Sequence, residues 1–173
     1  LFGRLRSISE KKAERTKRHA SELAAYDYVL KARAVICDSP ESVSQCKALY
    51  QKAIELDPDC GHAYAGFARM HSFEWTSGWS KSRRDTLDHA LTLARKSIVL
   101  DELDSEAHRG IGVMYLFSGE HDLSRNHLDR ALLLNPNDAD AMAYQGLFSI
   151  YDGKPEAALV WLERATKFNP YHH

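Results

Sequence analysis

Nine histidines are the residues whose chemistry first suggests a site in this chain, because imidazole binds metals and transfers protons. His121 and His127 lie six residues apart, so they do not occupy adjacent turns of one helical face. The others are dispersed, apart from the terminal His172–His173 pair. We therefore predict no metal site, and we expect His71 and His108 to pack between helices.

Carboxylates are the second group that could do chemistry. They cluster at turns and at expected helix starts, where capping of backbone N–H groups explains them. Five examples are Asp57, Asp59, Asp101, Asp104 and Asp138. The nine glycines are scattered and form no phosphate-binding loop. We predict no catalytic residue and no cofactor, so the chain is not expected to be an enzyme.

Composition and cysteine content indicate an ordinary soluble chain. It is 44% hydrophobic and 27% charged, with a net charge of −1, which favours neither nucleic acid nor a membrane surface as partner. No run approaches the roughly 20 apolar residues that span a bilayer. The cysteines, Cys37, Cys46 and Cys60, are odd in number and form no C-x-x-C pair. We expect a reducing, cytoplasmic compartment and simple burial of the thiols.

An internal repeat organises most of the sequence. Segments 53–59, 131–137 and 165–170 each start with Ala and reach Asn/Asp-Pro through apolar helical spacing. Pro136 and Pro170 are 34 residues apart, and Glu102 lies 34 before Pro136 at a similar helix ending. Segment 107–115 also parallels segments 63–71 and 141–147, and more loosely 25–32. Small residues recur where two helices must approach closely.

These features resemble the tetratricopeptide repeat family over roughly residues 22–170. The segment 105–136 fits the family pattern best, at Ile111, Gly112, Tyr115, Gly119, Leu128, Ala131 and Pro136, and it departs at His108 and Ser124. The next segment, 139–170, departs at Gln145 and Ser149. The resemblance implies an all-α fold, a right-handed α-solenoid of about four helical hairpins.

We expect helices near 22–36, 41–56, 60–74, 84–100, 105–117, 121–134, 139–151 and 155–168. Residues 1–21 form a basic linker helix, and the array spans 22–173. Its repeats are about 22–58, 60–102, 105–136 and 139–170. The second is ten residues longer than the family period, and we place this excess as an insertion at 73–83. Gly119 and Gly153 are expected to end first helices in a left-handed conformation.

Family members usually bind peptides or helices in the groove that the first helices line. Mapping those positions predicts partner-binding residues at Asp27, Lys31, His62, Arg69, Phe73, Arg109, Val113, Phe117, Leu147 and Tyr151, with Ala65 and Ala143 beside them. Arginines and aromatics are typical of binding hot spots. Equally, Phe73, Phe117 and Tyr151 would serve as packing between repeats. Gly110 and Val113 do not match the carboxylate clamp of the chaperone-tail subclass.

Two segments outside the repeat pattern have alternative readings. Trp75 and Trp79 either contact a partner or fold back on the adjacent helix. The basic segment 1–20, with seven basic and two acidic residues, is either a solvated helix or a contact to an acidic partner.

Segments 25–33, 53–59 and 61–68 and the closing Asn-Pro-Tyr-His are similar to the C-terminal repeats of bacterial class III adenylate cyclase-like proteins and related signalling regulators. The resemblance implies a regulatory module, and the chain is expected to be a fragment. The leading hypothesis is an interaction module of a bacterial signalling protein. The alternatives are part of an adenylate or guanylate cyclase with its catalytic domain elsewhere, and a free-standing scaffold. The partner is expected to be a protein or peptide, with a homodimer left open.

Overall fold

The computed structural model describes residues 2–169, with side chains from residue 13 onward. Within this range the chain forms only helices, joined by short turns. They are α1 (Phe2–Arg33), α2 (Pro40–Leu56), α3 (Gly61–Thr76), α4 (Arg83–Leu100), α5 (Ser105–Ser118), α6 (His121–Leu134), α7 (Ala139–Tyr151) and α8 (Pro155–Phe168). The all-helical class predicted from the sequence is confirmed.

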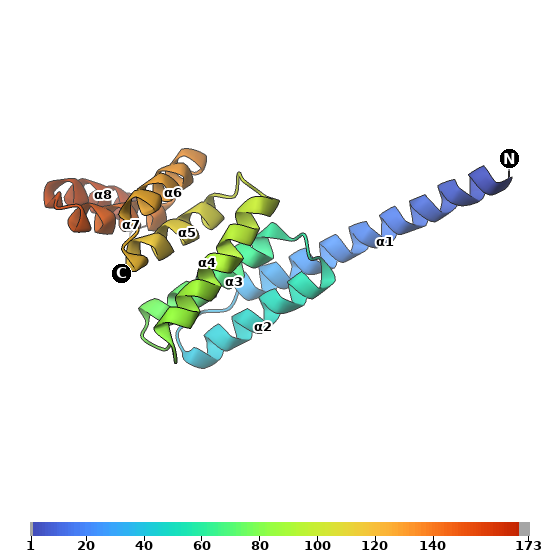
Figure 1. The fold of residues 1–173 in the computed structure, drawn as a ribbon, viewed down its shortest axis with the longest axis horizontal. Helices are drawn as coiled ribbons and strands as arrows, with labels where there is room; N and C mark the ends of the chain where they lie inside the picture. Colours follow the sequence, from blue (N-terminus) through green and yellow to red (C-terminus); the bar gives the residue numbers. More distant parts are fainter. Residues whose placement is uncertain (1, 170–173) are drawn as a thin grey trace.

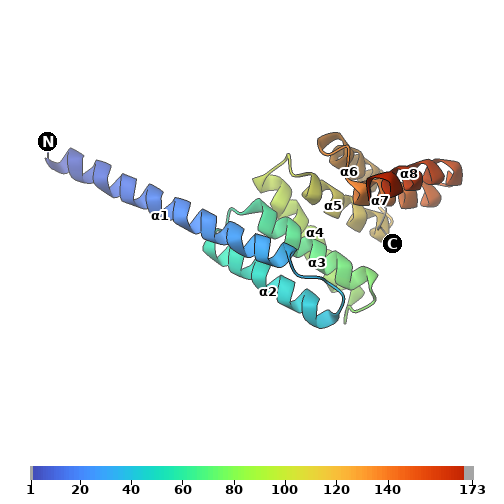
Figure 2. The ribbon, with the colours of Figure 1, turned by 180° about the vertical axis from the view of Figure 1, so that it is seen from behind.

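The helices form four hairpins that stack in chain order. Helix α1 packs on α2, α3 on α4, α5 on α6 and α7 on α8, and each second helix also contacts the next first helix. The first helices α1, α3, α5 and α7 contact one another in sequence, so they form one continuous layer. Figures 1 and 2 show this stack from opposite sides, with the N-terminal part of α1 extending away from it as a single helix.

Helix α1 differs from its prediction. We expected a basic helix up to residue 21 and a separate repeat helix at 22–36, whereas α1 runs without a break to Arg33. It then gives way to a loop that leads to Ser39, which has an extended backbone and caps α2 ahead of Pro40. The other seven helices begin and end within two residues of their predicted bounds.

Helix ends follow the local chemistry of the sequence. Asp104 and Asp138 accept backbone hydrogen bonds at the starts of α5 and α7, as the capping interpretation predicted. Gly119 ends α5 with a φ of 83°, and Gly153 follows α7 with a φ of 73°, both in the left-handed region. These ends fix the length and direction of the first helices, which carry the candidate binding surface.

The ten extra residues of the second repeat do not form one insertion at 73–83. Helix α3 continues to Thr76 and has 16 residues, whereas α5 has 14. Helix α4 has 18 residues and α6 has 14. The remaining extra residues lie in the connection between the two helices, which spans 77–82 in this repeat but only 119–120 in the third repeat. Trp75 therefore lies on a helix, because the helical hydrogen bonding of α3 extends past Phe73 instead of stopping there.

Close approach between paired helices depends on glycine. A Cβ placed on Gly112 would lie 3.0 Å from Cγ of Leu128, which is fully buried. The same pair recurs one period later, where a Cβ on Gly146 would lie 3.0 Å from Cγ of Leu162. The prediction that small residues mark helix contacts is confirmed at both positions.

Candidate partner-binding groove

A groove opens on the layer of first helices, where α3, α5 and α7 lie next to one another. Its volume is about 510 Å³. The lining residues, which we call the groove, are Cys37, Arg69, Met70, Ser72, Phe73, Thr76, Glu106, Arg109, Gly110, Val113, Asp140, Ala143, Tyr144 and Leu147. Three consecutive repeats contribute to it, and a single loop residue, Cys37, comes from the first.

The floor of the groove is apolar. Phe73 on α3, Val113 on α5 and Leu147 on α7 line it together, and all three were predicted as partner-binding residues. Met70 and Val113 are buried in the stack below, so their positions are fixed by core packing. A floor of this kind removes apolar surface of a bound side chain from water, which is the main source of affinity in such sites.

Glu106, in the first turn of α5, joins two arginines at one end of the groove. Its Oε2 lies 2.6 Å from Nη2 of Arg33, and its Oε1 lies 3.0 Å from Nε of Arg69. Arg69 also donates a hydrogen bond of 3.3 Å to the hydroxyl of Tyr50. These three charged side chains come from α1, α3 and α5, so the ion pairs connect three repeats.

Arg109 makes a second set of ion pairs. Its Nη1 lies 2.8 Å from Oδ1 of Asp138 and 2.8 Å from Oδ2 of Asp140. The side chains of Arg109 and Asp138 are only 14% and 9% exposed. Arg69 and Arg109 were predicted as anchors open to a partner, but both are already paired within the chain. They can still orient a ligand, because a paired guanidinium retains further N–H donors.

Replacing Asp138 by alanine should destabilise the fold, because this residue both caps α7 and pairs with a buried arginine. We expect a loss of about 2–3 kcal/mol in unfolding free energy, measured by urea titration. The matched control is Lys31→Ala. Lys31 pairs with Asp27 at 2.6 Å on the exposed face of α1, and its removal should leave the unfolding midpoint unchanged. Equal effects of the two changes would contradict this role of Asp138.

Comparison with known proteins gives one curated relative and a group of solved structures. No protein-family model matches the chain. Anaphase-promoting complex subunit 3 of Schizosaccharomyces pombe is 27% identical over 126 residues, which is 73% of this chain and 17% of that protein. The chain therefore spans about a sixth of the length of this relative.

Solved structures match at the level of fold. An O-GlcNAc transferase of Thermobaculum terrenum has a TM-score of 0.67 at 18% identity, over 87% of this chain and 26% of that one. PilF of Pseudomonas aeruginosa has a TM-score of 0.61 at 19% identity, over 92% of this chain and 64% of that one. MamA has a TM-score of 0.57 at 16% identity, over 94% of this chain and 84% of that one. PilF and MamA are tetratricopeptide solenoids, and these matches span nearly the whole stack. The chain folds as a tetratricopeptide-type solenoid.

Several of the residues that were predicted to bind a partner lie outside the groove. Asp27 and Lys31 pair with each other on α1. Phe117 packs against Trp75, with ring centroids 4.8 Å apart. Tyr151 is 59% exposed. Phe117 and Tyr151 occupy the register of Phe73 one and two repeats later, but only Phe73 reaches the groove.

His62, another predicted groove residue, lies over a neighbouring open hollow and contacts Asp104, with Nδ1 and Oδ2 3.0 Å apart. This hydrogen bond raises the pKa of His62. Burial alone would raise the pKa of Asp104, but the hydrogen bonds from His62 and from the N–H of Ala107 lower it. Asp101 lies close enough to complete a triad of potential metal ligands. Both carboxylates already accept backbone N–H bonds, so helix-end geometry accounts for them.

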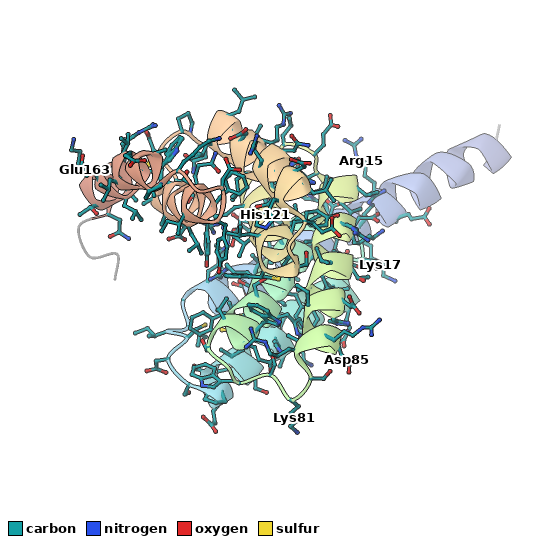
Figure 3. The ribbon with its side chains drawn as sticks, turned by 60° about the vertical axis from the view of Figure 1, so that its left-hand side comes forward. Arg15, Lys17, Lys81, Asp85, His121 and Glu163 are labelled. Atoms are coloured by element: carbon teal, nitrogen blue, oxygen red, sulfur yellow. The ribbon has the colours of Figure 1, made fainter. Side chains whose placement is uncertain are left out.

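The two tryptophans beside the α3–α4 connection contact the stack. The ring of Trp75 also lies under the guanidinium of Arg83, 3.9 Å from its centroid. Trp79 packs edge-on against Phe73, with centroids 5.7 Å apart. Figure 3 labels Lys81 in this connection, Asp85 in the first turn of α4 and Glu163 on α8. Trp79 therefore supports a groove residue from outside the groove.

Glu106, Asp140 and Tyr144 line the groove but were not predicted from the sequence. The repeat register contained a signal for the first two: they occupy the second position of α5 and α7, as His62 does in α3. Their pairing with the arginines depends on side-chain directions across helices, which the register does not give. Within the described residues, no helix is both long and apolar enough to cross a membrane.

Proposed function

We propose that this solenoid is a protein-interaction module and that it binds an apolar segment of a partner protein in the groove. The observation that carries the proposal is the groove itself: an apolar floor from three repeats, closed at one end by paired charges. This combination suits a peptide or helix with large apolar side chains and a polar edge. The name of the curated relative, a subunit of a complex, supports a role in assembly.

The internal pairing of the charges narrows the ligand class. A strongly acidic tail would compete with Glu106, Asp138 and Asp140 for the same arginines. A basic peptide would compete with the two arginines for the carboxylates that already pair with them. A segment of low net charge avoids both costs, because no buried ion pair has to be broken. The expected ligand is therefore amphipathic and close to neutral.

Blocking the groove tests the proposal. Ala143 is a half-buried groove residue, and Ala143→Trp fills the groove without removing a core side chain. Peptides selected from a random library on the immobilised wild-type chain should bind this variant about tenfold or more weakly by calorimetry. The matched control, Ala24→Trp, adds the same ring to an exposed position of α1 and should bind as wild type does. Equal affinity for both variants, or no selectable peptide, would contradict the proposal.

The setting of the module is proposed separately. We infer that the solenoid serves a larger signalling assembly in the cytoplasm, and that any catalytic activity belongs to other domains or partners. The bacterial origin and the cyclase-like parent stay predictions from the sequence resemblance. So do the free-standing scaffold, the homodimer, and the absence of nucleic-acid and membrane partners.

A further inference from the structure

Two cysteine thiols lie in contact at the boundary of the groove. The Sγ atoms of Cys37 and Cys46 are 3.3 Å apart, and both thiols are free. Cys37 belongs to the loop between α1 and α2, and Cys46 belongs to α2. Sulfur atoms at this distance need a shift of only about 1.3 Å to reach the length of a disulfide bond.

The loop can supply this shift. Residues 36 and 37 lie in its irregular part, and among the described residues neither makes a backbone–backbone hydrogen bond. Cys37 packs half-buried against the core, and besides its contact with Cys46 its sulfur makes only weak contacts, to the carbonyl of Val35 at 3.7 Å and to Sδ of Met70 at 3.6 Å. Cys46, in contrast, is fixed in a helix and is fully buried. Cys37, which lies outside a helix, is therefore the sulfur that would move.

The environments of the two thiols also differ in reactivity. Cys37 is half-buried and lines the groove, so small solutes reach it from that side. Burial, together with the hydrogen bond to Cys37, raises the pKa of Cys46 to about 12. Cys46 therefore stays protonated near neutral pH and does not meet an oxidant first. The arrangement places an accessible sulfur in front of a protected one, as in a peroxidatic and resolving pair.

We propose that Cys37 and Cys46 form a reversible disulfide when the protein meets a hydroperoxide. The Cys37 sulfur attacks the peroxide oxygen, the O–O bond breaks, and the products are a Cys37 sulfenic acid and an alcohol or water. The Cys46 sulfur then attacks the Cys37 sulfur, the S–O bond breaks, and hydroxide leaves with the proton of Cys46 as water. The two thiols together lose two electrons, and the hydroperoxide gains them.

The disulfide would change one wall of the groove. In the thiol form Cys37 lies against Met70, whose neighbours Arg69 and Phe73 also line the groove. Bonding to Cys46 pulls the Cys37 sulfur toward α2 and ties the loop to that helix. The chemistry does not depend on the identity of any ligand in the groove.

Mass spectrometry of the whole chain tests the proposal. After hydrogen peroxide treatment, the chain should lose the mass of two hydrogen atoms and regain it with dithiothreitol. Trypsin cuts after Arg33 and Lys47, so both cysteines fall on the peptide 34–47, which should carry the whole change. Cys60 should remain free to react with iodoacetamide, and a Cys60→Ser variant should behave as wild type does.

Two variants separate the steps. In Cys46→Ser, the sulfenic acid on Cys37 should persist and react with dimedone, whereas Cys37→Ser should give neither product. The oxidised wild type should also melt on the order of 5 °C higher, because the bond restricts the unfolded chain. Oxygen addition on Cys37 of the wild type without loss of hydrogen would overturn the proposal. A bond to Cys60 or between two chains would overturn it as well.

Discussion

Gly66→Ala should lower the melting temperature by about 10 °C, a loss of about 3 kcal/mol. A Cβ on Gly66 would lie 2.2 Å from Cε1 of Tyr50, a contact that no packed structure accommodates. The ring of Tyr50 is fully buried, and its hydroxyl accepts a hydrogen bond from Arg69. The ring therefore cannot rotate aside without disturbing both the core and the charged end of the groove.

The matched control is Gly110→Ala, at the same register position one repeat later. A Cβ on Gly110 meets no atom within 4 Å, so this change should raise the melting temperature by a few degrees through helix propensity. The difference arises in the preceding helix, where Ala94 of α4 occupies the register of Tyr50 in α2. Thermal melts of both variants measure it, and similar melting temperatures would contradict the packing described for Tyr50.

Acidification should destabilise the protein through His71. Burial, followed by the charges of Lys47 and His89, lowers the pKa of His71 to about 4, against a smaller opposing effect of Glu74. The unfolded chain takes up the proton near pH 6.5, whereas the folded one does not. This contribution to stability is present above pH 6.5 and is lost as the pH falls toward 4. The loss is about 2 kcal/mol at pH 5.

His71→Phe isolates this effect. Both ring nitrogens of His71 are buried without a hydrogen-bond partner among the described residues, so an apolar ring suits the site. Urea titrations at pH 7 and pH 5 should show that the variant loses about 2 kcal/mol less than wild type. His19→Gln, on the exposed part of α1, is the control and should lose as much as wild type. An unchanged pH dependence in His71→Phe would contradict the assignment.

Two other histidines also contribute to the pH dependence of stability in this range. The contribution of His71 is therefore isolated by comparing wild type with His71→Phe. The pKa of His127 is also lowered to about 4, by burial first and then by His108 and Arg95, so this residue adds to the acid loss. The raised pKa of His62 has the opposite effect on the pH dependence of stability. Its pair with Asp104 stabilises the fold most below pH 6.5 and weakens as the pH rises. These contributions are common to wild type and His71→Phe.

The sequence predicted the repeat helices well because each boundary has a local cause. Ser39 with Pro40, Asp104, Asp138, Gly119 and Gly153 act on neighbouring backbone atoms, and these effects are visible in a short window of sequence. The course of α1 was harder to predict. Its basic N-terminal part has the composition of a linker, and no stop signal separates it from the repeat helix that follows.

The groove was predicted in part. Arg69, Phe73, Arg109, Val113 and Leu147 meet there because the repeat register brings one face of successive first helices together. The register does not show which charges neutralise each other. Glu106 pairs with Arg33, which lies 73 positions earlier in the sequence. The two side chains meet only because three hairpins stack. The contact between Cys37 and Cys46 likewise depends on how the α1–α2 loop folds back.

NMR mapping shows directly whether the partner binds on α3, α5 and α7. A peptide selected on the wild-type chain is titrated into the isotope-labelled protein, and backbone amide shifts are followed. We expect the largest changes around Arg69, Val113 and Ala143. The outer face of α8 offers a rival apolar surface, with Leu159 63% and Leu162 40% exposed. Changes centred on Leu159 and Leu162, with the groove unaffected, would contradict binding in the groove.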